Sequence, residues 1–193
     1  LEKRVDGDGD ARILLLDVTG ILTEEKKCTL GLRQEISMVD EFREALKKAG
    51  RDRNIRGLVV RINSPGGTVT ASDILRHEIL EYRKKTGVRV VACLMDVAAS
   101  GGYYVATAAD EIVAHPTTIT GSIGVIAKKF NVQGLFGKIG VEAEAIKSGD
   151  KKDILSPFRP ATEEERKIVQ SVIDQLHGRF VEVIAEGRKP LSR

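Results

Sequence analysis

The apolar positions of the chain fall into short runs that alternate with stretches of helical periodicity. Residues 12–18, 57–62 and 88–94 are apolar runs followed by turn-forming or small residues, and each predicts a buried β-strand. Residues 36–46 carry apolar side chains at helical spacing, and a second helix is expected over about residues 71–85. This alternation predicts an α/β fold with a largely parallel sheet, right-handed crossovers and flanking helices.

The later part of the chain predicts one more strand and a long helix. Val141–Ile146 alternates apolar and acidic residues, as expected of a strand with one buried face. Thr162 and Glu165 have the spacing of a capping box, in which two residues exchange hydrogen bonds at the start of a helix. The helix that follows is predicted over about residues 163–186.

The length and hydrophobic content indicate one domain. A chain of 193 residues with 41% hydrophobic content can bury one substantial core, which we expect over residues 12–188. Residues 1–11 are interpreted as a flexible polar lead, and the family resemblance described below implies that residues 189–193 are a truncated C-terminal end. The chain begins at Leu1 and has neither a signal peptide nor an apolar stretch near the roughly 20 residues of a membrane helix. We therefore expect a soluble fragment of a longer protein.

Composition excludes several classes of partner and cofactor. The 31 basic and 28 acidic residues give a net charge of +3, and they are interspersed, so we expect no nucleic-acid partner. Aromatic residues make up 4% of the chain and tryptophan is absent, which leaves few stacking platforms. Cys28 and Cys93 match no metal-binding spacing, and a buried thiol is the ordinary interpretation of Cys93. We expect no disulfide framework, metal or organic cofactor.

Ser100 is the first candidate for chemistry. It lies in Ala98–Tyr104, between residues too small to shield its hydroxyl, just before a helix predicted over residues 103–109. A helix start directs free backbone N–H groups at the same place, which suits an oxyanion, and Gly101 could donate one of them. The alternative is that Ser100 only caps this helix and that the glycines permit close packing.

A second glycine-rich break supports the catalytic interpretation. Asn63–Gly67 follows a predicted strand, and its paired glycines would let the backbone approach a ligand closely, with Gly67 as a second oxyanion donor. The alternative is a simple tight turn. Because ligands bind beyond the carboxyl ends of parallel strands, the two breaks could face one pocket.

The sequence offers two kinds of general base for a serine. His77 and His177 fall in predicted helices and His115 precedes a proline, so none has a context typical of a catalytic histidine, although a Ser-His-Asp triad stays open. A lysine is the alternative if burial lowers its pKa from about 10.4 toward neutrality. Such a drop of about 3 units corresponds to about 4 kcal/mol. Composition cannot choose among the lysines.

Ordered motifs resemble one peptidase family. Four segments, Val60–Gly67, Ala98–Tyr104, Thr120–Val125 and Ser148–Pro157, are similar to signal peptide peptidase A and occur in that family's order and at its intervals. The resemblance covers about residues 13–188. It implies the crotonase-like α/β fold of the Clp and crotonase superfamily, and a serine peptidase whose nucleophile is Ser100.

The resemblance also implies the partners of this serine. The family's lysine base stands just before the aspartate of the fourth segment, which is Lys152 here, with neighbouring Lys151 as the main rival and Lys147 as a further one. A solvated surface charge is the alternative for all three lysines. The family's lysine-orienting serine matches Ser122, and its oxyanion hole uses the amides that match Gly67 and Gly101.

The family further implies a biological setting. Its members degrade remnant signal peptides at prokaryotic membranes, with an extracytoplasmic catalytic domain and a membrane anchor. We expect the same setting here, with the membrane reached through an anchor outside this chain. Single-copy members assemble into homo-oligomeric rings in which neighbouring protomers can share the dyad, and because one copy is present in this sequence we expect the short, oligomeric form. Two alternatives stay open: a crotonase-like acyl-CoA hydratase or isomerase, and a non-catalytic scaffold of the same fold.

Overall fold

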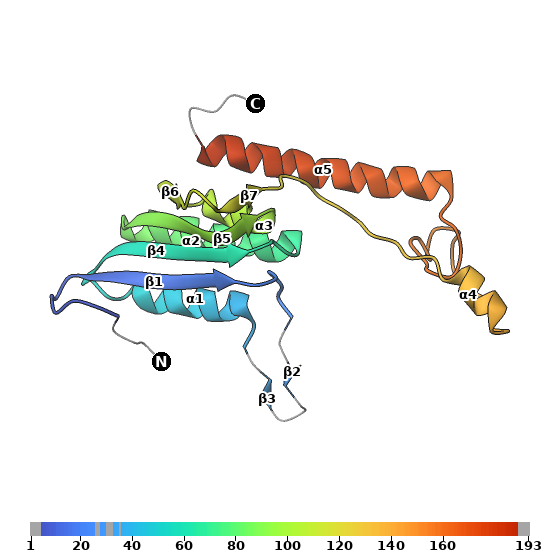
Figure 1. Ribbon diagram of the computed structural model, residues 1–193, viewed down its shortest axis with the longest axis horizontal. Helices are drawn as coiled ribbons and strands as arrows, with labels where there is room; N and C mark the ends of the chain where they lie inside the picture. Colours follow the sequence, from blue (N-terminus) through green and yellow to red (C-terminus); the bar gives the residue numbers. More distant parts are fainter. Residues whose placement is uncertain (1–4, 26–27, 30–32, 35, 189–193) are drawn as a thin grey trace. The chain divides into compact units, whose positions relative to one another are not determined.

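The computed structural model describes residues 5–25, 28–29, 33–34 and 36–188. The chain divides into two compact units, which are described separately (Figure 1). Unit 1 comprises the chain up to Ile123 together with the part from Phe180 onward, and unit 2 comprises Gly124–Arg179. The single domain expected over residues 12–188 stays a prediction.

Unit 1 is built on a parallel sheet. Its strands follow the order β1-β4-β5-β6, and β1, β4 and β5 lie side by side (Figure 1). The strands span Arg12–Thr19 (β1), Ile55–Ser64 (β4), Arg89–Ala99 (β5) and Glu111–Ala114 (β6). A short strand β7, Ile119–Gly121, pairs in parallel with the last residues of β5. The predicted α/β fold with a largely parallel sheet is confirmed.

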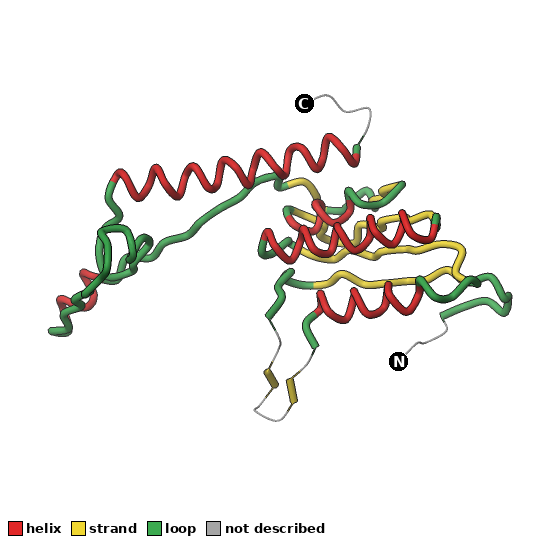
Figure 2. Tube along the Cα trace, turned by 180° about the vertical axis from the view of Figure 1, so that it is seen from behind, coloured by secondary structure: helices red, strands yellow, loops and turns green. Residues whose placement is uncertain are grey.

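Three helices of unit 1 follow the strands, with strands in yellow and helices in red in Figure 2. They are α1 (Met38–Ala49), α2 (Val69–Thr86) and α3 (Gly101–Ala106). The Thr68 side chain caps α2 by accepting a hydrogen bond from a backbone amide, and Gly87 ends this helix at a φ of 68°, which glycine adopts without strain. In a separate two-stranded sheet, β2 (Cys28–Thr29) pairs antiparallel with β3 (Arg33–Gln34).

The core lies on one face of this sheet. Alternate residues of β4, namely Leu58, Val60 and Ile62, are buried with apolar side chains of α1 and α2. Each large aliphatic side chain buried in this way stabilises the fold by about 1.5–3 kcal/mol. The opposite face carries Arg61, which is 44% exposed, and beside it Cys93 is half-buried. The buried thiol expected at Cys93 is therefore corrected to a half-buried one, because its side chain faces away from the core helices.

The last turns of α5 (Glu163–Gly187) belong to unit 1 and pack on α3. The rings of Tyr104 and Phe180 meet edge to face, with centroids 5.1 Å apart, and Val183 is fully buried beside them. Arg76 on α2, itself almost buried, donates to the Glu186 carboxylate at 3.2 Å. The ring contact holds α3, the helix that follows Ser100, and the ion pair joins α5 to α2.

Unit 2 contains α4 (Gln133–Lys138) and the first part of α5. The capping box is confirmed: the Thr162 amide donates to Glu165 at 2.9 Å, and the Glu165 amide donates back to the threonine hydroxyl at 3.2 Å. The strand predicted over Val141–Ile146 is wrong. None of the residues of unit 2, all of which are described, lies in a strand, so the alternating segment has no neighbour with which to pair.

A helix that crosses a bilayer needs about 20 predominantly apolar residues. Among the described residues no helix, the 25-residue α5 included, combines such length with such apolar character.

Candidate active site

Ser100 lies in a strained turn between β5 and α3. Its backbone has a φ of 51° and a ψ of −121°, a region that costs non-glycine residues about 1–3 kcal/mol. It stands at the N-cap position of α3, but its side chain makes no capping hydrogen bond. Among the described residues the half-buried hydroxyl has no partner, so helix capping does not account for this serine.

The glycine-rich loop after β4 packs directly against this turn. A Cβ added to Gly66 would lie 2.9 Å from the Ser100 Cβ and 2.7 Å from the Gly101 nitrogen. The Gly66 carbonyl accepts from the Leu22 amide at 3.0 Å, and the Leu22 carbonyl accepts from the Thr68 amide at 2.8 Å. These bonds fix the loop in a parallel bridge, so the close approach requires glycine and the loop is more than a simple turn.

Two amides beside Ser100 are available to a ligand. In the described part of the chain, the N–H groups of Gly67 and Gly101 donate no hydrogen bond. A Cβ built on Gly101 would lie 3.3 Å from the Gly67 nitrogen, which places the two backbones next to each other. Paired amides of this kind can bind the negative oxygen of a tetrahedral intermediate.

The end of β7 brings Ser122 next to the same turn. The register pairs Ala99 with Gly121, so Ser100 and Ser122 are the next residues along two adjacent strands. The Ser100 amide donates to the Gly121 carbonyl at 2.8 Å, and Ser122 has a φ of 53° and is exposed. Unit 1 thus brings four predicted site residues together: Ser100, Gly67, Gly101 and Ser122.

The histidines have local contacts only. His77 is exposed on α2, and the His115 Nδ1 lies 2.8 Å from the Thr117 hydroxyl. His177 is exposed on α5 in unit 2. Within the described residues of unit 1, neither of its two histidines contacts Ser100, so the geometry gives no support to a Ser-His-Asp triad.

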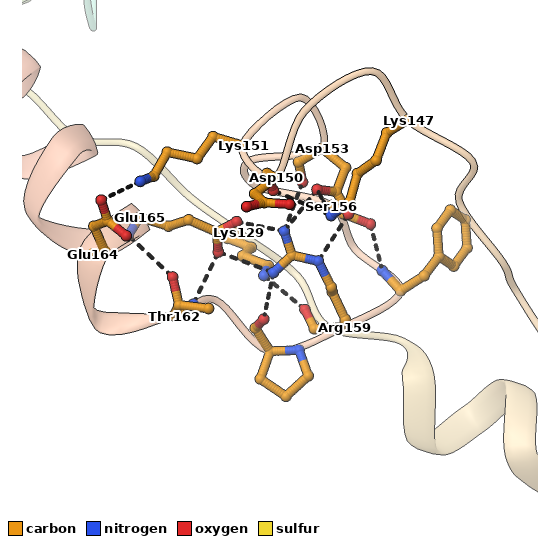
Figure 3. A network of polar contacts seen from close by, with 12 residues as sticks. Lys129, Lys147, Asp150, Lys151, Asp153, Ser156, Arg159, Thr162, Glu164 and Glu165 are labelled. Carbon is orange, nitrogen blue, oxygen red and sulfur yellow. Dashed lines mark hydrogen bonds and ion pairs between the residues drawn. The ribbon is translucent and has the colours of Figure 1, made fainter.

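Lys152 lies in unit 2, on the loop before α5. Its amide donates to the Gly149 carbonyl at 3.1 Å, and its side chain is exposed. The two rival lysines hold carboxylates: Lys151 pairs with Glu164, and Lys147 donates to Asp153 at 2.6 Å (Figure 3). As far as the structure is described, the Lys152 ammonium has neither an ion pair nor a hydrogen bond.

Arg159 connects the Lys152 loop to the start of α5. Its Nε and Nη2 atoms each donate to one oxygen of Asp153 at 2.8 Å, and its Nη1 donates to Glu165 at 3.0 Å (Figure 3). These contacts, strengthened by Lys147, hold the pKa of Asp153 well below its usual range. The same guanidinium and the Thr162 amide lower the pKa of Glu165 to about 2. The sequence indicated Glu165 only as a capping residue and gave no signal for Arg159.

The fold and the site define a class. A serine in a strained turn at the end of a parallel strand, with two unpaired amides beside it, is the arrangement of a serine hydrolase of the α/β class. A protein-family profile described as "Peptidase family S49" matches residues 82–192. The chain belongs to peptidase family S49, and the resemblance to signal peptide peptidase A is confirmed.

Relatives carry matching names. The chain is 36% identical over 183 residues to the Enterococcus faecium protein named "Putative signal peptide peptidase SppA", covering 95% of this chain and 53% of that protein. It is 35% identical over 150 residues to "Protease 4" of Haemophilus influenzae, covering 78% of this chain and 24% of that protein. The chain therefore spans about half or less of the length of these relatives.

A solved structure supports the fold. A ClpP1 mutant from Listeria monocytogenes superposes with a TM-score of 0.53 at 18% identity, covering 92% of this chain and 72% of that one. This likeness confirms the Clp-like fold that the sequence predicted.

Proposed function

We propose that this chain is the catalytic part of a Ser-Lys serine peptidase, with Ser100 as nucleophile and Lys152 as general base. The observation that carries the proposal is the strained Ser100 turn, where a free hydroxyl lies beside two unpaired amides. Membership of family S49 supports the same chemistry.

The proposed reaction starts with neutral Lys152. Its amine takes the proton of the Ser100 hydroxyl as the serine oxygen bonds to the carbonyl carbon of a peptide. The amides of Gly67 and Gly101 stabilise the resulting oxyanion. The lysine ammonium returns the proton to the leaving amine, and water then releases the acyl group by the reverse sequence. Ser122 would accept or donate a hydrogen bond that orients the lysine.

The contacts of the lysine loop favour Lys152 over its rivals. A carboxylate next to a lysine stabilises the protonated form and opposes its use as a base. Lys147 and Lys151 each hold such a carboxylate, and Lys152 is the lysine of this loop whose ammonium is left without one in the described contacts. Lys152 would still have to be desolvated at the active site, because it is exposed here.

The substrate that we propose is an extended apolar peptide, such as a signal peptide remnant. The name of the Enterococcus relative supports this choice. We also propose action at the outer side of a prokaryotic membrane, as a homo-oligomeric ring. Since Ser100 and Lys152 belong to separate compact units, the dyad would be completed by the chain's own unit 2 or by that of a neighbouring copy.

Labelling with a fluorophosphonate across pH tests the dyad. We expect an adduct on Ser100, located by mass spectrometry, that is lost in Ser100→Ala and Lys152→Ala and kept in Lys151→Ala. Acyl-CoA binding without any adduct would support the hydratase or isomerase alternative instead. Absence of both would leave the non-catalytic scaffold.

A further inference from the structure

We propose that Arg159 is a positioning residue for the base: it fixes the Lys152 loop on α5 and occupies the carboxylates that would otherwise pair with Lys152. This inference rests on the proposed Ser-Lys function and extends it to a residue that does not touch substrate. The evidence is a set of contacts within unit 2, here called the Arg159 cluster and defined as Lys147, Asp153, Arg159 and Glu165.

The cluster links the lysine loop to a helix that is itself well anchored. The guanidinium holds both oxygens of Asp153, the residue immediately after Lys152, and both oxygens of Glu165. Glu165 is 3% exposed and accepts from the Thr162 amide at the start of α5. Bidentate contacts of this kind restrict orientation as well as distance. The planar guanidinium of Arg159, bonded to Asp153 on one side and to Glu165 on the other, therefore fixes the backbone on the C-terminal side of Lys152.

Further bonds hold the rest of the loop. The Asp153 carbonyl accepts from the Ser156 amide at 2.9 Å, and the Lys152 amide donates to Gly149 at 3.1 Å. The Lys129 ammonium donates to the Arg159 carbonyl at 2.7 Å, and this hydrogen bond connects Arg159 to the segment before α4. The backbone before Lys152 and the backbone after it thus each form a hydrogen-bonded turn.

The charges of the cluster cancel. Lys147 and Arg159 supply two cations, and Asp153 and Glu165 supply two anions. The lowered pKa values of both carboxyl groups keep them ionised and paired over the whole neutral range. The carboxylate adjacent to Lys152 in sequence therefore already has two cationic partners, and it is not free to hold the Lys152 ammonium.

The other charged groups bonded to this loop are also accounted for. Glu164 of α5 pairs with Lys151, and Lys129 contributes a cation through its bond to the Arg159 carbonyl. The backbone carbonyl of Asp150 accepts a hydrogen bond from the Lys147 ammonium. The Asp150 carboxylate is the remaining anion of the loop. Removing the Arg159 charge would leave Asp153, the residue next to Lys152, with Lys147 as its remaining cationic partner, and Glu165 without its guanidinium partner. The added net negative charge of the loop would favour the protonated form of Lys152.

Opposite changes of charge make the inference testable. Labelling requires neutral Lys152, so its pH midpoint follows the pKa of this lysine in the assembled site. In the whole chain, Arg159→Gln should raise the midpoint by about half a unit to one unit, and the isosteric Asp153→Asn should lower it by a similar amount. Arg159→Lys, which keeps the charge, should keep the midpoint near that of the wild type.

The controls separate this role from simple support of the fold. A purely structural role would lower the labelling rate at every pH and leave all midpoints unchanged, and that result would overturn the inference. If Arg159→Gln fails to fold, as judged by circular dichroism, Lys147→Gln removes a cation from the less buried edge of the cluster and should also raise the midpoint. Labelling that survives in Lys152→Ala would overturn the proposed function, and this inference with it.

Discussion

The amide of Ser100 donates to the carbonyl of Gly121 at 2.8 Å, so the proposed nucleophile is fixed by the strand that ends one residue before Ser122. Both serines have positive φ values, and both follow the last paired residues of their strands. A movement of one turn would therefore affect the other through this backbone hydrogen bond and the pairing of β5 with β7.

Ser122→Ala tests whether the second serine orients the base. We expect the labelling rate of Ser100 to fall by about two- to tenfold, because loss of one neutral hydrogen bond costs about 0.5–1.5 kcal/mol. The thermal midpoint should stay unchanged, since the Ser122 side chain is exposed. Ser171→Ala on the exposed surface of α5 is the matched control. Equal labelling rates in the two variants would argue against an orienting role.

Gly101→Ala tests the close packing at the oxyanion amides. Its new Cβ would lie 2.2 Å from the Ser72 hydroxyl oxygen, and we expect a loss of about 1–3 kcal/mol in the free energy of unfolding. Adding Ser72→Ala removes that clash and should restore much of the stability, measured by urea unfolding. Labelling should stay low in the double variant, because the Cβ still lies 3.3 Å from the Gly67 nitrogen. Full labelling there would contradict the proposed oxyanion hole.

Much of unit 1 could be predicted because its local signals agree with its tertiary structure. The runs at residues 12–18 and 57–62 lie in strands β1 and β4, and the helix expected over about residues 71–85 lies within α2. The strand predicted at Val141–Ile146 failed, because strand formation needs a partner as well as an alternating pattern. Periodicity reports which face a segment could bury, and it does not report whether a neighbour is available.

Some residues of the candidate site could likewise be predicted from the sequence, and others could not. Gly67 and Gly101 could be found from sequence because close approach of two backbones demands glycine. The role of Arg159 could not, because six residues separate it from each of two carboxylates and only the folded loop brings them together. Lys152 could be chosen only by family resemblance, since Lys147 and Lys151, which precede it, differ from it in contacts and not in residue type.

Acid should selectively weaken the Arg159 cluster. The carboxyl pKa values of Asp153 and Glu165 are lower in the fold than in an unfolded chain, so their contribution to stability is fully present above the unfolded value of about 4. It is lost as the pH falls through about 2. We expect the stability difference between the wild type and Arg159→Gln to shrink from pH 5 to pH 2 in thermal unfolding followed by circular dichroism. Arg166→Gln, at an exposed ion pair, should show little such change.

Mixing two inactive proteins would show where the dyad is completed. Ser100→Ala retains Lys152, and Lys152→Ala retains Ser100, so neither should be labelled alone. If neighbouring copies share the dyad, co-refolded mixtures should recover about a quarter to a half of the wild-type labelling, because some interfaces contain both intact residues. Recovery of none, with mixed oligomers demonstrated by mass spectrometry, would place both residues of each dyad in one chain.

The strained backbone at Ser100 lowers the thermal stability of the fold at the residue that the proposed reaction requires. Glycine adopts a φ of 51° freely, so Ser100→Gly should unfold at a higher temperature than Ser100→Ala, in which the strain persists without the hydroxyl. Selection for heat resistance alone would then favour loss of the proposed nucleophile. If Ser100 serves the proposed peptide cleavage, only a continuing need for that reaction would retain a serine there, and relatives released from that need should lose the serine first at this position.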